Sequence, residues 1–417
     1  MICLLSTICV IGLGYIGLPT ASLLASKGYK VHGVDVKTEV IEILKRGEIH
    51  LHEPDLDVLV KSAINSGNLT VSLKPVQADV FIIAVPTPLG ANNSPDLTYI
   101  EAAINLIAEV VRAGNLIILE STSPVGTTEK VGEWIKRARP DLQIGENNQT
   151  SLAPVYIAHC PERVLPGQIL KELIVNNRIV GGIDEISARI AAEFYGQFVT
   201  GTVMTTNART AELVKLTENT FRDVNIGFAN ELSLICDELN INVWDVIGLA
   251  NQHPRVNILE PGPGVGGHCI AVDPWFIVDG APEKSKLIRI ARSVNLEKTE
   301  YTYFSIISKA KRFKNPVIAC LGLSFKANVD DVRESPALEI VRRLAELEDA
   351  KLLVVEPNLN ELPAELFNRS NVIKVDLDEA VHKADIVALL VNHKSFYTIG
   401  RSTLAQKIVI DTRGVWR

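Results

Sequence analysis

The chain has 417 residues, more than one hydrophobic core normally serves, so two or three domains are expected. Its composition, 47% hydrophobic and 22% charged, is that of a globular α/β protein and excludes a disordered or fibrous chain. The formal net charge of -7 offers no basic surface to nucleic acid, so an anionic substrate would need local cations.

Six cysteines are scattered along the chain without a C-x-x-C pair, which is typical of a reducing compartment and predicts a cytoplasmic location. The apolar start, residues 1–25, is not expected to be a signal peptide. It lacks a basic leading region and is interrupted by three glycines and Pro19. No apolar run is long enough to span a bilayer, so no membrane partner is expected.

The first half of the chain alternates short apolar runs with helical stretches, which predicts a parallel sheet covered by helices. The run from Asp79 to Val85 is almost continuously apolar, as in strands buried on both faces. The expected strands are Thr7–Ile11, Lys30–Val36, Asp79–Val85, Leu116–Glu120 and Val155–Ala158.

The middle of the chain has a different pattern. From about Ala208 to Asn240, apolar residues recur at intervals of three and four, which predicts one long helix. The segment from Glu260 to Cys269 is dense in proline and glycine and is too irregular for a helix or a strand. The apolar positions of the predicted helix are Leu213, Leu216, Val224, Leu232, Ile235 and Leu239.

After Lys314 the strand and helix alternation resumes. The predicted fold class is therefore α/β, with two Rossmann-like doubly wound parallel-sheet domains joined by a central helical segment. The expected boundaries are 1–205 for an NAD-binding domain, 206–313 for the helical segment and 314–417 for a second nucleotide-fold domain. The expected strands of that last domain are Val317–Leu323, Lys351–Glu356, Asp385–Val391 and Lys407–Asp411.

A dinucleotide fingerprint follows the first predicted strand. Gly12, Gly14 and Gly17 form G-x-G-x-x-G between a strand and a helix, and Asp35 ends the next strand. Glycines permit a tight turn and close approach of pyrophosphate, while the carboxylate accepts from a ribose hydroxyl. Asp35 would repel a 2′-phosphate, so the sequence predicts NAD as cofactor rather than NADP.

Lys215 and Asn219 are four residues apart and therefore share one face of the predicted long helix, off its apolar stripe. A lysine and an amide that project together can hold a sugar hydroxyl and the oxyanion derived from it. From the helix alone, a solvated surface face is the favoured interpretation, because exposed Lys and Asn are common.

Cys269 follows Gly266 and Gly267 and precedes Asp273 by four residues. Glycines let backbone N–H groups approach a ligand, and a thiol near a helix start is biased towards the nucleophilic thiolate. The other five cysteines are expected to be buried small hydrophobes. No second Cys/His cluster stands at ligand spacing from Cys269, so no metal is expected.

The order of these motifs resembles the UDP-sugar 6-dehydrogenase family over essentially the whole chain. Seven motifs occur in the family's sequence order, which chance does not explain. They are Gly12–Gly17, Ala84–Pro88, Glu120–Thr122, Cys160–Arg163, the Lys215/Asn219 helix, Gly266–Cys269 with Asp273, and Phe325–Lys326 with Arg333–Pro336.

The resemblance implies a four-electron oxidation of a sugar 6-hydroxyl through a thioester on Cys269. It matches Lys215 and Asn219 to the pair that steadies the substrate oxygen, and Asp273 to a carboxylate that holds water. Thr122 and Glu162 match residues beside that water. The implied cofactor-binding residues are Gly12, Gly14, Tyr15, Ile16, Gly17, Asp35, Pro86, Thr87, Thr122, Lys326 and Arg333.

The resemblance also implies a homodimer in which Arg255 reaches the partner's substrate, and a UDP end bound by Arg413. The implied substrate-binding residues are Glu162, Arg163, Val164, Lys215, Asn219, Arg222, Arg255, Asn257, Gly266 and Arg413.

Two positions separate this chain from the UDP-glucose enzymes of the family. Those enzymes usually carry Glu where this chain has Pro166, and commonly Ser where it has His268. The UDP-N-acetylhexosamine branch resembles the chain better at both positions. A further likeness at Asp273–Phe276 and Asp411–Trp416 implies UDP-N-acetylmannosamine as substrate. The alternatives are oxidation of UDP-N-acetylglucosamine, a one-step NAD-dependent hydroxyacid dehydrogenase, and a catalytically silent nucleotide-sugar sensor.

Overall fold

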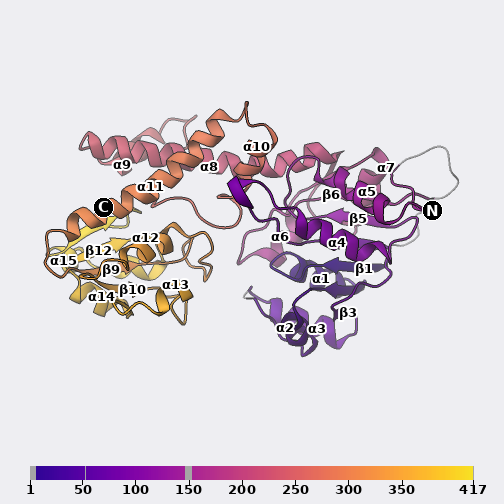
Figure 1. Cartoon of the computed structure of the whole chain (residues 1–417), viewed down its shortest axis with the longest axis horizontal. Helices are drawn as coiled ribbons and strands as arrows, with labels where there is room; N and C mark the ends of the chain where they lie inside the picture. The colour runs from indigo at the N-terminus through magenta and orange to yellow at the C-terminus, as the bar shows by residue number, and fades with distance from the viewer. Residues whose placement is uncertain (1–5, 52, 146–152, 417) are drawn as a thin grey trace. The chain divides into compact units, whose positions relative to one another are not determined.

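The computed structural model describes residues 6–51, 53–145 and 153–416 (Figure 1). The prediction of a buried Cys3 lies outside the described residues. The chain divides into two compact units, the first reaching to Thr217 and including Trp275–Gly280, the second comprising Glu218–Pro274 and Ala281–Arg417. No helix among the described residues combines the length and apolar character needed to cross a bilayer.

The first unit is built on an eight-stranded sheet with the order β3-β2-β1-β4-β5-β6-β7-β8. All neighbouring strands run parallel except β6 and β7, which pair antiparallel. The strands are β1 (Thr7–Ile11), β2 (Lys30–Val34), β3 (Leu69–Ser72), β4 (Val80–Ile83), β5 (Leu116–Leu119), β6 (Tyr156–His159), β7 (Arg178–Gly182) and β8 (Val203–Asn207).

Helices cover both faces of this sheet, because successive side chains of each strand point to opposite sides. Ile8 and Val10 of β1 join one buried cluster, whereas Cys9 and Ile11 join another. The helices are α1 (Gly17–Ser26), α2 (Thr38–Lys45), α3 (Leu56–Asn65), α4 (Thr98–Ala108), α5 (Thr127–Ala138), α6 (Ile169–Val175) and α7 (Glu185–Tyr195), with the 3₁₀ turn η1 (Ala91–Asn93).

The second sheet lies in the second unit and has the order β11-β10-β9-β12-β13, with every pair parallel. Its strands are β9 (Val317–Leu321), β10 (Lys351–Val355), β11 (Val372–Lys374), β12 (Ile386–Leu389) and β13 (Ile408–Asp411). Its helices are α12 (Pro336–Leu344), α13 (Ala364–Phe367), α14 (Leu377–Lys383) and α15 (Arg401–Leu404), with the 3₁₀ turn η2 (Lys394–Thr398).

These two sheets confirm the predicted α/β class with two Rossmann-like domains. One pair departs from the parallel arrangement, because β6 and β7 of the first sheet pair antiparallel. Strands β3, β7, β8 and β11 were not predicted. Strand β11 has only three residues, and β3, β7 and β8 carry polar, charged or glycine residues that weaken the apolar signal.

The two sheets share a turn after their first strand. Gly12 and Gly322 both have a left-handed backbone, with φ of 92° and 95°. Glu356 stands after β10 as Asp35 stands after β2, and each accepts from the backbone N–H of the residue that follows the turn glycine. Glu356 is buried and also accepts from His393, so this acid is engaged internally. The carboxylate of Glu356 is therefore less accessible to a dinucleotide ribose than that of the half-buried Asp35.

The middle of the chain is helical, with α8 (Ala208–Glu238), α9 (Val243–Ala250), α10 (Asp273–Gly280) and α11 (Lys286–Ala310). Helix α8 confirms the predicted long helix and is visible in Figure 1 as the longest ribbon. Its apolar pattern does not mark its buried face, because three predicted apolar positions are exposed. These are Leu213, Ile235 and Leu239.

Within the second unit, the buried side of α8 is polar instead. Asn219, Asp223, Asn230 and Ser233 are all nearly inaccessible to solvent. Asp223, Asn230 and Ser233 hydrogen bond to polar side chains on α11, namely Arg292, Asn295 and Lys298. Buried polar groups of this kind are tolerated only when they are hydrogen bonded to one another.

Candidate active site

The glycine turn after β1 is shaped to receive a phosphate group. A Cβ at Gly17 would lie 1.8 Å from the carbonyl oxygen of Gly12, so no larger residue fits there. Gly14 is different, because it is exposed and open space surrounds the position of its missing Cβ. Helix α1 begins at Gly17 without a capping side chain, and the start of a helix directly after a glycine turn favours an anion.

Two further groups fit a dinucleotide at this turn. The half-buried Asp35 carboxylate accepts from the N–H groups of Leu13 and Lys37, which fixes it at the end of β2. The buried hydroxyl of Thr87, in the loop after β4, has no hydrogen-bond partner within the described structure. An unsatisfied buried hydroxyl costs free energy unless a ligand or water pairs with it. The residues present therefore fit the NAD that the sequence predicts.

A buried cluster of charged side chains lies at the carboxyl ends of β5 and β6. The guanidinium of Arg178 forms an ion pair with Glu162, and both side chains are almost wholly buried. Tyr195 donates to Glu120 over 2.7 Å, while the second oxygen of Glu120 has no hydrogen-bond partner among the described residues. Arg178 thus orients Glu162, one of the predicted catalytic residues.

Burial and neighbouring charges set the protonation of this cluster. Burial, together with the carboxylate of Glu162, raises the pKa of Glu120 to about 8, so Glu120 holds a proton at neutral pH. Burial works against the charge of Arg178, yet the adjacent Glu162 raises the pKa of that guanidinium above its usual value. Burial is also the main reason that the pKa of His159 falls to about 3, with a smaller contribution from the positive charge of Lys215.

Helix α8 carries Lys215 and Asn219 one turn apart. The amide nitrogen of Asn219 donates to Asp273 over 2.5 Å, and its oxygen accepts from Arg222, also at 2.5 Å. Asn219 is only 2% exposed, so the interpretation of this position as a solvated surface was wrong. The physical reason is Asp273, which lies 54 residues further along the chain and covers this position.

Cys269 lies in the turn that leads into α10. Its carbonyl oxygen accepts from the N–H groups of Val272 and Asp273, which places the thiol one turn before the helix begins. Cys269 is partly exposed, whereas Cys9, Cys160, Cys236 and Cys320 are buried. The expectation that only Cys269 is accessible therefore holds among the described cysteines.

The glycine-rich segment before Cys269 packs on loops of the second sheet. A Cβ at Gly267 would lie 2.8 Å from the ring of Phe325, and one at Gly266 would lie 2.3 Å from the carbonyl oxygen of Glu334. A Cβ at Gly262 would lie 2.5 Å from the guanidinium of Arg413. This close packing explains why the segment needs glycine and seats it beside the loop that carries Lys326 and Arg333.

Several predicted residues take positions that do not define a role. Arg255, Asn257 and Pro86 are exposed, and so are Lys326 and Arg333. Arg333 forms an ion pair with Asp331 over 2.5 Å. Tyr15, Ile16, Thr122, Arg163 and Val164 are half-buried, and Val164 packs against a core cluster of the first unit.

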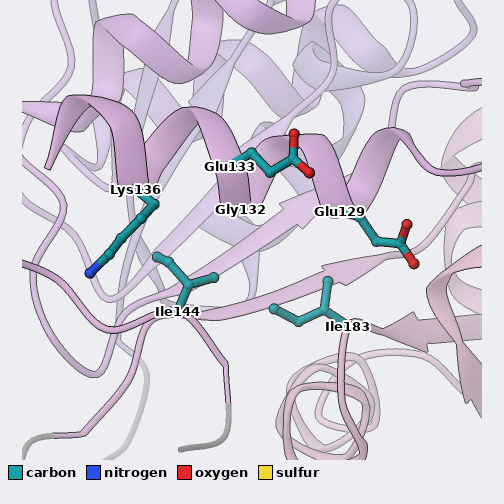
Figure 2. Close-up of a pocket in the computed structure, with 6 residues that line it drawn as sticks. All are labelled: Glu129, Gly132, Glu133, Lys136, Ile144 and Ile183. Carbon is teal, nitrogen blue, oxygen red and sulfur yellow. The ribbon is translucent and has the colours of Figure 1, made fainter. Parts of the chain in front are cut away.

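A hollow of about 530 Å³ lies along α5, away from every predicted site residue (Figure 2). Ile144 and Ile183 face the helix that carries Glu129, Glu133 and Lys136. Lys136 already donates to the carbonyl oxygens of Pro140 and Leu142, and Glu129 is paired with Arg209. No group of His, Cys, Asp and Glu among the described residues is arranged to hold a metal ion.

Sequence reasoning did not single out Arg178, Tyr195, Asn230 or Asn295. The only signal for Arg178 is a charged residue that opens an apolar run. The only signal for Asn230 is that it follows Asp223 by seven residues, a spacing that places two side chains on the same face of a helix. Neither signal distinguishes a buried polar residue from an exposed one.

A glycine cradle for a dinucleotide, a second nucleotide-type sheet and an accessible cysteine define a cofactor-dependent oxidoreductase. The comparisons with known proteins agree. Residues 6–199, 209–297 and 319–417 match the NAD binding, central and UDP binding domains of the UDP-glucose/GDP-mannose dehydrogenase family. The chain belongs to this family and is an NAD-dependent dehydrogenase.

Its relatives include enzymes for different nucleotide sugars. It is 54% identical to a UDP-N-acetyl-D-mannosamine dehydrogenase of Campylobacter jejuni, over 94% of this chain and 96% of that protein. It is also 54% identical to an NDP-N-acetyl-D-galactosaminuronic acid dehydrogenase of Ralstonia nicotianae, over 98% and 96%. The solved UDP-D-ManNAc dehydrogenase of Pyrococcus horikoshii aligns with a TM-score of 0.87 at 39% identity, over 99% and 96%.

Proposed function

We propose that this protein oxidises the 6-hydroxymethyl group of UDP-N-acetyl-D-mannosamine to the uronate in two steps, as a precursor for surface polysaccharide. The observation that carries the proposal is the partly exposed Cys269 at the start of α10, beside the hydrogen-bonded pair Asn219 and Asp273. A one-step dehydrogenase has no use for such a thiol. We also propose that the domain boundaries lie at 205/206 and 313/314 and that the protein is located in the cytoplasm.

In the first step, Lys215 or a bound water takes the proton of the 6-hydroxyl. Bound NAD supplies the hydride acceptor for this step, and a second NAD supplies it for the next. The product of the first step is an aldehyde. The residues proposed to hold NAD are Gly12, Gly14, Tyr15, Ile16, Gly17, Asp35, Pro86, Thr87, Thr122, Lys326 and Arg333.

In the second step, the thiolate of Cys269 adds to the aldehyde carbon and forms a thiohemiacetal, which can lose a hydride as the free aldehyde cannot. Asn219 has a second amide hydrogen besides the one given to Asp273, and we propose that it stabilises the oxyanion together with Lys215. Loss of the hydride leaves a thioester. Water held by Asp273, Thr122 and Glu162 hydrolyses it, which releases the carboxylate and restores the thiol.

The proposed substrate is tested by assaying the purified protein with UDP-N-acetylmannosamine, UDP-N-acetylglucosamine, UDP-N-acetylgalactosamine and UDP-glucose. We expect the mannosamine sugar to give the highest kcat/KM and two NADH per sugar. Pro166 supplies no carboxylate for a free 2-hydroxyl, so UDP-glucose should be poorer by roughly 10 to 200-fold if size alone decides. A larger ratio, on the order of 10⁴, would indicate an unpaired buried polar group.

The Ralstonia relative makes the galactosamine sugar a second candidate, since its identity to this chain equals that of the Campylobacter enzyme. A higher kcat/KM for the galactosamine or glucosamine sugar would replace the proposed substrate and leave the thioester chemistry standing. Comparable values for UDP-glucose would remove the argument from Pro166. A ratio of one NADH per sugar would favour the one-step dehydrogenase, and no NADH at all would favour the silent sensor.

We further propose a homodimer in which Arg255 serves the partner's substrate. Within the second unit, Phe221, Phe228 and Ile235 are spaced by seven residues on α8 and are 66%, 53% and 49% exposed. A row of exposed apolar side chains on a helix is typical of an interface. The exposed side chain of Arg255 is compatible with this role.

The shared site predicts complementation between two inactive variants. Chains with Arg255→Ala should be nearly inactive, and so should chains with Cys269→Ala. Mixed and refolded together, they should recover roughly a quarter of wild-type activity, because half of the dimers are hybrids with one complete site. Arg289→Ala, at another surface arginine, should show no such pattern. Full activity from a monomer in light scattering contradicts the proposal.

A further inference from the structure

A directed chain of hydrogen bonds runs through the buried face between α8 and α11. The backbone N–H of Gly262 can only donate, and it donates to Oδ1 of Asn230 over 2.9 Å. The amide nitrogen of Asn230 therefore points the other way and donates to Oδ1 of Asn295 over 2.8 Å. Asn295 in turn donates to the Asp223 carboxylate over 2.8 Å, which also accepts from Arg292 over 2.7 Å.

Each link fixes the orientation of the next one. Asn230 and Asn295 are 0% and 1% exposed, so water does not offer them alternative partners. An amide that turned over would place two donors or two acceptors against each other. Leaving a buried polar group unpaired costs about 1–3 kcal/mol. The carboxylate of Asp223, which Arg292 holds in place, therefore fixes the orientation of both amides. That orientation presents Oδ1 of Asn230 to the N–H of Gly262.

Gly262 is also where the glycine-rich segment contacts Arg413, the arginine that follows the last strand of the second sheet. A Cβ there would lie 2.5 Å from Nη1 of Arg413, so the backbone and the guanidinium are in close contact. Arg413 follows β13 and donates from Nε to the carbonyl oxygen of Leu390, just after β12. Ligands of such sheets bind outside the carboxyl ends of the strands.

We propose that Asn230 and Asn295 are positioning residues that hold Gly262 against Arg413 and thereby set the affinity of the second unit for the diphosphate end of the nucleotide. This inference rests on the proposed function, in which Arg413 binds the UDP end of the substrate. Neither asparagine touches the ligand. Both act through the backbone of the glycine-rich segment.

The test measures the Kd of UDP by isothermal titration calorimetry on the full-length protein. Asn230→Leu removes the acceptor for Gly262 at nearly the same volume, and the Kd of UDP should rise at least about tenfold, equivalent to about 1.4 kcal/mol. Asn230→Asp keeps an acceptor for Gly262 but sets a carboxylate oxygen against Oδ1 of Asn295, so its Kd should rise by less than that of the Leu variant. In the Leu variant, KM for the sugar should rise far more than kcat falls.

Thr302→Val provides the matched control. Thr302 is buried on α11 and bonds only to the carbonyl oxygen of Lys298 in its own helix, among the interactions of the described structure. It should lower thermal stability without changing the Kd of UDP. If Asn230→Leu does not fold, Asn295→Ala takes its place, with an expected rise in Kd of at least about threefold, since Asn230 then loses its fixed orientation.

The outcomes separate the two proposals. If the wild-type protein does not bind UDP, the proposed function fails. If the wild type binds UDP and Asn230→Leu binds it equally well, the positioning role is overturned. Equal losses of UDP affinity in the Leu, Asp and Thr302→Val variants would also overturn it, because general destabilisation would then explain the effect.

Discussion

Replacing Cys269 with alanine should abolish uronate formation, with a fall in acid production of at least about 10³-fold. The second oxidation needs a thiohemiacetal, and among the described residues Cys269 is the only partly exposed cysteine. NAD binding should be unchanged, because the glycine turn after β1 lies in the first unit and does not include Cys269. Mass spectrometry of the product and fluorescence titration of NAD check the two expectations separately.

Cys236→Ala is the control for the loss of a thiol. Cys236 belongs to the same unit but is buried, so its replacement should leave uronate formation within about twofold of wild type. Full acid production by the Cys269→Ala variant would rule out the thioester mechanism. Loss of NAD binding in that variant would mean that the substitution disturbs more than the chemistry.

The second large effect concerns stability. Replacing Arg178 with methionine should lower the free energy of unfolding by about 3–5 kcal/mol, because it leaves buried carboxyl groups without their cation. Arg178 is 2% exposed and Glu162 is 6% exposed, so solvent does not compensate. Chemical denaturation followed by circular dichroism measures the difference. Adding Glu162→Gln to the variant should restore part of the loss, since it removes the unpaired charge.

Arg46→Met is the matched control, because Arg46 pairs with Glu48 on the exposed surface, where solvent screens the pair, and its replacement should change stability little. The deficit of Arg178→Met should shrink as the pH falls from 8 to 5. A buried carboxyl that has lost its cation binds a proton more readily in the folded than in the unfolded chain, and this favours folding at low pH. Equal losses in the two variants, or a deficit independent of pH, would contradict this account.

The sequence predicted the strands that are buried on both faces and missed those at the margins. Strand β4 is wholly apolar and was predicted within three residues at either end, because such a run needs no tertiary information. Strand β7 ends in Gly181 and Gly182, which signal a turn from sequence alone. A Cβ on Gly181 would lie 2.6 Å from the side chain of Ala211, so close packing of α8 imposes glycine at this position. That contact is tertiary and leaves no local pattern.

In the candidate site, too, features with a local sequence signal were predicted and features that depend on distant contacts were not. The glycine fingerprint and Cys269 were identifiable because their neighbours in sequence carry the signal. The burial of Asn219 was not, since its partner Asp273 is distant in the chain. The covered face of helix α8 was not predictable for a related reason, because several of its apolar side chains are exposed and several of its polar side chains are buried. Amphipathic spacing identifies a helix but not which face is covered.

Helices α8 and α11 meet through polar side chains, and this determines how their sequence may change. If one helix slid past the other by a turn, about 5.4 Å, apolar side chains could exchange one apolar partner for another. The hydrogen bond between Asn230 and Asn295 would instead break. The pairing thus encodes a single register, much as one buried asparagine does in a coiled coil. A single residue inserted within either helix should therefore rotate its polar face by about 100° and separate these hydrogen-bonded partners.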